Sequence, residues 1–149
     1  MNDARIFLIG AGPGDPSLLT VKGHQYLTTA DVIVYDHLVH QRMLSLARPD
    51  AETIDVGAAT PRPLDQDAIC LLLAEKAREG KTVARLKWGD PFVFGGGGKE
   101  ALFLHEQGVP FEVVPVILPG IGGPTFAGIP VTYPDAGDTL TLVRGHEGE

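Results

Sequence analysis

The sequence predicts an α/β fold, a five-stranded parallel sheet with helices on both faces. Apolar runs rich in β-branched residues alternate over residues 1–115 with segments of helical periodicity. The connections are short, and right-handed crossovers then bring every strand's carboxyl end to one edge of the sheet. A glycine-rich loop after the fourth run is typical of the ligand sites of such sheets.

The expected strands and helices follow from these patterns. Thr20 and Asp65 are placed to cap helices, because their side-chain oxygens can accept from backbone N–H groups of a first turn. Gly80 and Gly108 are placed to close helices. Strands are expected at 5–9, 32–35, 52–56, 82–86 and 111–114, and helices at 21–29, 38–46, between Asp65 and Gly80, and at 101–107.

Two segments of different character divide the chain. Residues 1–115 are expected to form a cofactor- and substrate-binding α/β domain. Residues 116–130 hold four glycines and three prolines, which makes a helix unfavourable there. A strand is expected at 139–143, so residues 116–149 are interpreted as a linker and the first strand of an incomplete second domain.

Composition excludes several classes of function. The net charge of −7 argues against nucleic acid as a partner, since binding it needs a basic face. No apolar run could span a bilayer and no signal peptide is recognisable, which favours a cytoplasmic location. The single cysteine, Cys70, excludes an intrachain disulfide. With scattered histidines, no metal site is expected.

Five segments are expected to meet at the carboxyl edge of the sheet. They are the loop at 10–16, Asp36, the Gly57 turn, the glycine-rich loop at 88–98, and the segment after Val114. Glycine has no Cβ, so the backbone can approach a ligand closely in such loops. The edge is therefore the candidate binding site.

The motifs, taken together, resemble one family. In order they are GAGPGDP at 10–16, VYD at 34–36, GDPFVFG at 89–95, VVP at 113–115 and AGIP at 127–130. Their order and spacing resemble those of the tetrapyrrole methylases, and are most similar to the members that methylate uroporphyrinogen III. The resemblance covers essentially the whole chain, but only the family's N-terminal domain and the start of its second domain.

The resemblance implies S-adenosylmethionine-dependent C-methylation of uroporphyrinogen III to precorrin-2, in sirohaem and cobalamin biosynthesis. It implies S-adenosylmethionine as methyl donor, no metal, a small-molecule tetrapyrrole substrate and a homodimer. By position, Asp36 matches a carboxylate thought to accept a proton. The positions matched to cofactor contacts are Pro13, Trp88, Gly89, Asp90, Val93, Leu118 and Pro119.

The chain departs from the family's pattern at several of these positions. The family's Gly-Lys is Gly57-Ala58 here, which removes a lysine suggested as proton donor. Leu118 and Pro119 replace a Thr/Ser-Ala pair, and Pro119 has no N–H to donate. Further replacements are Trp88 for Gly, Gly96 for Arg and Val116 for Gly.

Other functions stay open at this point. The chain could be another tetrapyrrole methylase, or a degenerate relative that is inactive alone and pairs with another copy of itself or with another subunit. Gly10-x-Gly12 with Asp36 also partly fits a nicotinamide dinucleotide site, but Asp15 would repel the pyrophosphate. The substrate carboxylates need local cations, for which His37, Arg42, Arg62 and Lys87 are candidates.

Overall fold

The computed structural model describes residues 5–57, 60–61 and 63–145. These residues form one five-stranded sheet of order β3-β2-β4-β1-β5, and every pairing in it is parallel. The fold class predicted from the sequence is confirmed, and the strand ends differ from the expected ones by at most one residue. The strands are β1 (Ile6–Gly10), β2 (Val32–Tyr35), β3 (Glu52–Asp55), β4 (Val83–Lys87) and β5 (Phe111–Val114).

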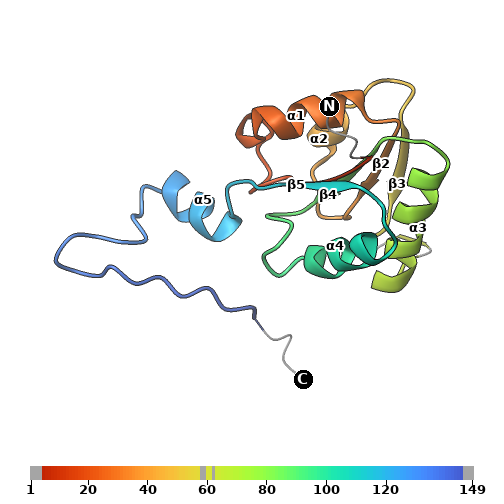
Figure 1. Ribbon diagram of the computed structural model, residues 1–149. Helices are drawn as coiled ribbons and strands as arrows, with labels where there is room; N and C mark the ends of the chain where they lie inside the picture. The colour runs from red at the N-terminus through yellow and green to blue at the C-terminus, as the bar shows by residue number, and fades with distance from the viewer. Residues whose placement is uncertain (1–4, 58–59, 62, 146–149) are drawn as a thin grey trace.

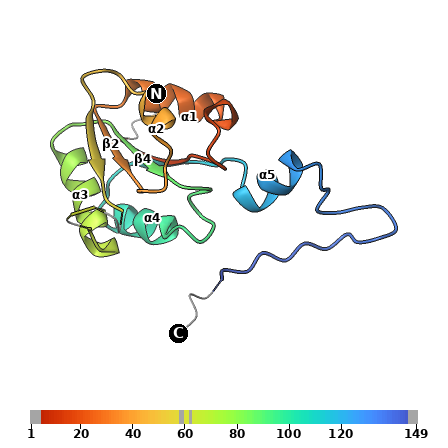
Figure 2. The same ribbon diagram turned by 180° about the vertical axis from the view of Figure 1, so that it is seen from behind.

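Helices cover both faces of the sheet (Figures 1 and 2). On one face α1 (Val21–Thr29) and α2 (Gln41–Leu44) bury Leu27 and Met43 against Ile9, Ile33 and Leu86. On the other face α3 (Gln66–Arg78) and α4 (Gly97–Glu106) pack on alternate residues of the same strands. Because side chains of a strand alternate between faces, one set of strands supplies both cores.

The helix caps are those that the sequence predicts. The Thr20 side chain accepts from Gly23 N at 3.1 Å, and the Asp65 side chain accepts from Ala68 N at 2.8 Å. Two helix boundaries differ. Helix α2 is shorter than expected, because the His40 imidazole caps it at Arg42 N. Helix α4 begins inside the glycine run. Gly96 is its N-cap residue at a φ of 68°, a conformation that glycine adopts readily, and the helix starts at the next residue.

The segment after β5 corrects two expectations. Residues Pro119–Phe126 form helix α5 although their propensity is poor. Pro119 occupies the first helical position, where a missing N–H costs nothing. Residues 139–143 are described and form no strand, because no strand among the residues that the structure describes lies beside them to pair with their backbone. In Figures 1 and 2, α5 lies beyond the edge of the sheet, and the chain after it runs outward, turns and comes back on the side of α4.

The loops after β1 and β4 are joined at the carboxyl edge of the sheet. Gly12 N donates to Gly89 O at 3.2 Å, and Gly89 N donates to Gly12 O at 3.3 Å. Gly89 has a φ of 68°, and a Cβ there would lie 3.3 Å from Pro119 Cδ. Val116 fills the space over Gly10, where a Cβ would collide with it. The convergence expected from topology is thus present. No helix among the described residues is long and apolar enough to cross a membrane.

Asp31 gives a first test of the fold. Its carboxylate accepts from Thr82 N at 2.8 Å and pairs with Arg48, and the Thr82 N–H is the main cause that holds the pKa of Asp31 below 3.8. An acid with a lowered folded pKa stabilises the protein above its unfolded pKa. We expect Asp31→Asn to lower the free energy of unfolding by about 1 kcal/mol at neutral pH. Urea titrations should show this difference shrinking as the pH falls through the lowered pKa.

The exposed Asp138 is the matched control, since Asp138→Asn removes the same charge from a surface position. It should change the free energy of unfolding little. An Asp31→Asn effect that stays constant as the pH falls well below the lowered pKa would contradict the assigned role of the charge.

Two glycines give a second test with opposite signs. Gly89→Ala places a side chain at positive φ, which costs about 1–2 kcal/mol. Gly98 lies in α4 with ordinary φ, and no heavy atom lies within 4 Å of the place that a Cβ would take. Gly98→Ala should therefore raise the stability by about 0.5 kcal/mol. Chemical denaturation of both variants checks the pair. Equal effects would show that the Gly89 turn is not strained.

Candidate functional site

A cleft of about 600 Å³ opens at the carboxyl edge of the sheet. It collects residues from the ends of β2, β3 and β4, from the start of α5 and from the extended C-terminal segment. Its wall is mostly apolar, with one carboxylate, which suits a small molecule with apolar and polar parts. The lining residues are Asp36, His37, Leu38, Gly57, Trp88, Gly89, Val93, Phe94, Gly95, Leu118, Pro119, Gly120, Leu142 and Val143.

Six of the eight site residues predicted from the sequence line this cleft. Pro119 begins α5 and packs beside Gly89, so the replacement of Thr/Ser-Ala by Leu118-Pro119 builds an apolar wall. Trp88 is 45% exposed. The six residues are Asp36, Trp88, Gly89, Val93, Leu118 and Pro119.

Pro13 and Asp90 lie beside the cleft and are not among its lining residues. Pro13 packs against α5, where a Cβ on Gly122 would lie 3.1 Å from its ring. The Asp90 carboxylate accepts from Phe92 N at 2.9 Å and from Val116 N at 3.2 Å. Asp90 therefore joins the glycine-rich loop to the segment after β5. The cofactor contacts assigned to both residues by resemblance stay predictions.

Asp36 follows β2 and is held on both carboxylate oxygens. Its Oδ1 accepts from Arg85 Nη2 at 2.5 Å, and its Oδ2 accepts from Trp88 N at 3.1 Å. Its own backbone N–H donates to Leu86 O at 3.1 Å, which continues the ladder between β2 and β4. The side chain is 28% exposed, so the carboxylate is held by Arg85 and Trp88 on its inner side and is open to the cleft on the other.

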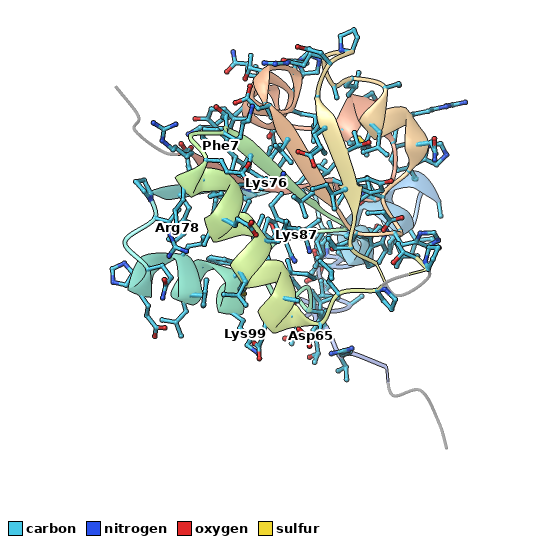
Figure 3. All side chains as sticks on the ribbon, turned by 90° about the vertical axis from the view of Figure 1, so that its right-hand side faces the viewer. Phe7, Asp65, Lys76, Arg78, Lys87 and Lys99 are labelled. Atoms are coloured by element: carbon cyan, nitrogen blue, oxygen red, sulfur yellow. The ribbon has the colours of Figure 1, made fainter. Side chains whose placement is uncertain are left out.

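A buried charge cluster lies beneath Asp36. Arg85 and Lys87 project from β4 on one face, and Glu100 projects from α4; each is at most 1% exposed. Glu100 Oε1 accepts from Arg85 Nη2 at 3.2 Å, Lys87 Nζ at 2.8 Å and Gln66 Nε2 at 3.0 Å. Figure 3 shows Lys87 near the middle of the molecule and Lys99 at its edge.

Burial is the main cause that lowers the pKa of Lys87, and the neighbouring Arg85 charge lowers it further, while Glu100 opposes the shift. Lys87 is buried and paired with Glu100, so it is not available to bind substrate carboxylates, for which the sequence had made it a candidate cation. Arg62 and Ala58 lie outside the described residues.

Sequence reasoning missed Arg85 and Glu100. A signal was present, because Arg85 and Lys87 stand two residues apart in a run otherwise typical of a buried strand. Two charges on one face of such a strand require partners there. Arg85 and Lys87 share one partner, Glu100, which follows them closely in the sequence. Only the packing of α4 on β4 shows that Glu100 is that partner.

His37 and Asp55 form a second polar group at the rim of the cleft. His37 Nδ1 lies 3.0 Å from Asp55 Oδ2, and Asp55 Oδ1 accepts from Gly57 N at 2.9 Å. The His37 side chain is half exposed. The pair fixes the ring at the entrance. Within the part of the chain that the structure describes, no group of three or more His, Cys, Asp or Glu side chains could hold a metal ion.

The geometry suits an elongated ligand that carries a positive charge. The apolar side chains of Val93 and Leu118 offer contact area, Asp36 offers a fixed carboxylate, and Gly89, buried beside Pro119, contributes a part of the wall that has no side chain. An S-adenosyl nucleoside, with an aromatic base and a sulfonium, has this combination of groups, so the residues present fit the methyl donor that the resemblance implies.

Comparisons with known proteins show to which family the chain belongs. The model of the tetrapyrrole (corrin/porphyrin) methylases matches residues 5–149. A uroporphyrinogen-III C-methyltransferase of Methanocaldococcus jannaschii is 49% identical over 97% of this chain and 60% of its own length. One from Bacillus subtilis is 47% identical over 95% of this chain and 56% of its own length.

Solved structures share the fold. A uroporphyrin-III C-methyltransferase of Thermus thermophilus has a TM-score of 0.79 at 45% identity, covering 89% of this chain and 56% of that one. The same kind of enzyme complexed with S-adenosyl homocysteine has a TM-score of 0.73 at 45% identity, over 89% of this chain and 51% of that one.

The chain spans between half and three fifths of the length of these relatives. Over that length the family model, the sequence identity and the fold all agree. The chain belongs to the tetrapyrrole (corrin/porphyrin) methylases.

Proposed function

We propose that the protein containing this chain catalyses S-adenosylmethionine-dependent C-methylation of uroporphyrinogen III to precorrin-2. The observation that carries the proposal is the cleft in which the Asp36 carboxylate and the Trp88–Gly89 turn face the same space. Relatives at 47–49% identity are named for this methylation, which supports the choice of substrate. Because those relatives are longer, the activity is proposed for the whole protein.

The residues proposed to hold the methyl donor are those that line the cleft. Val93 and Leu118 would pack on its apolar parts, and the backbone at Gly89 would approach it closely. The donor supplies an electrophilic methyl group on a sulfonium. Holding donor and acceptor in line can contribute on the order of 7–11 kcal/mol to the barrier reduction, so shape contributes more than any single side chain.

Asp36 is proposed to accept the proton that the reaction releases. A bond forms between the methyl carbon and a pyrrole carbon, and the sulfur–methyl bond breaks with its electron pair staying on sulfur. The methylated ring then loses one proton. Asp36 has the charge and the exposure to take it, and a positioned base contributes ~10²–10⁴-fold.

Further parts of the proposal rest on the resemblance. The substrate is a tetrapyrrole, the active form is a homodimer, and the location is cytoplasmic. His37 at the entrance, paired with Asp55, is the described side chain best placed to meet a substrate carboxylate.

Donor binding can be measured without turnover, because Trp88 is the single tryptophan of the chain and lines the cleft. Titration with S-adenosyl homocysteine should change its fluorescence saturably, and calorimetry should give the same Kd. NADH at equal concentration should leave the signal unchanged once its own absorbance is corrected. No heat and no fluorescence change with a folded protein would contradict the proposed donor site.

Turnover separates an enzyme from an inactive relative. We expect the protein to methylate uroporphyrinogen III, and Asp36→Asn to lower kcat by ~10²-fold or more while S-adenosyl homocysteine still binds. Asp138→Asn, which removes a surface charge, should leave kcat unchanged. Donor binding without any turnover would favour the degenerate relative over the enzyme.

A further inference from the structure

We propose that Arg85 is a positioning residue that aims the Asp36 carboxylate into the cleft, with Glu100 holding the guanidinium in place. The chemistry assigned to Asp36 rests on the proposed function. The positioning itself rests on contacts among buried groups, and it can be tested separately.

The guanidinium of Arg85 joins the site to the core. Its Nη2 donates both to Asp36 Oδ1 at 2.5 Å and to Glu100 Oε1 at 3.2 Å, and its Nε donates to the same Glu100 oxygen at 3.2 Å. Its Nη1 lies near the carbonyl oxygens of Val34 and Leu86, at 3.5 and 3.4 Å. Every edge of the group therefore has a partner, so its orientation is fixed.

Asp36 has two fixed bonds and one open side. Arg85 holds Oδ1 from within, and the backbone N–H of Trp88 holds Oδ2 from the loop after β4. Both donors come from β4 or the residue that follows it. The carboxylate plane is thereby set by β4 and not by β2, although Asp36 itself follows β2. Its exposed part faces the cleft.

Glu100 completes the arrangement from α4. Its Oε1 accepts hydrogen bonds from Arg85, Lys87 and Gln66, while its Oε2 has no hydrogen-bond partner among the described residues. A fully buried carboxylate with an unpartnered oxygen is unfavourable for folding alone. Glu100 serves here as the counter-charge of Arg85, because its Oε1 accepts from both Nε and Nη2 of the guanidinium.

Arginine and lysine differ at this position. The planar guanidinium reaches Asp36, Glu100 and two carbonyl groups at once, whereas an ammonium offers one point charge on a shorter reach. Arg85→Lys keeps the positive charge and loses the geometry. The substitution therefore separates positioning from charge balance.

The test uses the single tryptophan. In this chain, selective ¹⁵N-tryptophan labelling gives one backbone amide and one indole signal, and the backbone N–H is the one that donates to Asp36. Asp36→Ala defines the amide shift when the bond is lost. We expect Arg85→Lys to move the amide signal most of the way to that position. Arg78→Lys is the matched control, since Arg78 donates to Gln107 on the surface and should not move the signal.

Glu100→Gln is the second variant, which keeps the shape of the side chain and removes its charge. It should move the Trp88 amide in the same direction, and it decides the question if Arg85→Lys does not fold. The proposal is overturned if the chemical shift of the Trp88 amide is unchanged in whichever of these two variants folds, although Asp36→Ala changes it.

A kinetic cycle tests the consequence for catalysis. Arg85→Lys should lower kcat by about 100-fold, the cost of a misplacement near 1 Å, with KM little changed. In the Asp36→Ala background the same substitution should change kcat by less than about 2-fold, since Arg85 acts through Asp36. Equal effects in both backgrounds overturn the proposal. Absence of all turnover would refute the proposed function, and the amide signal would still decide the positioning role.

Discussion

Strand β4 is the constraint on which the rest of the molecule depends. It lies in the middle of the sheet, hydrogen-bonded to β2 on one side and to β1 on the other. Its end fixes the cleft, because the loop that follows pairs with Gly12 and bonds Asp36. Its side chains also carry two buried cations. Desolvating charges costs several kcal/mol per ion, so the two buried cations of this strand lower the stability of the fold next to the site that the strand supports.

Most of the fold could be predicted because it depends on local pattern. Alternating apolar runs and helical periodicity located every strand of the sheet, and cap chemistry placed Thr20 and Asp65 correctly. The errors lie where tertiary contacts override propensity. Helix α5 forms from a segment rich in glycine and proline that packs through Gly122 against Pro13, and residues 139–143 have no partner strand within the described part of the chain.

The candidate site was partly predictable. Topology alone brings Asp36, Gly57 and Gly89 to one edge, and the cleft there contains all three. The interior support was not predictable in the same way. The pairing of Arg85 with Glu100 depends on how α4 packs against β4, and neither residue belongs to a loop. Sequence pattern therefore locates the residues that line such a site more readily than the buried residues that support them.

A loop with as many glycines as the one after β4 is expected to be flexible, but two of its glycines are tightly packed. A Cβ on Gly97 would collide with Pro91 O, and one on Gly95 would lie 3.3 Å from the Lys87 stem. These positions are small because they are crowded. Close packing at these two positions limits the shapes that this part of the loop can take, so less conformational entropy remains to be lost when a ligand binds there.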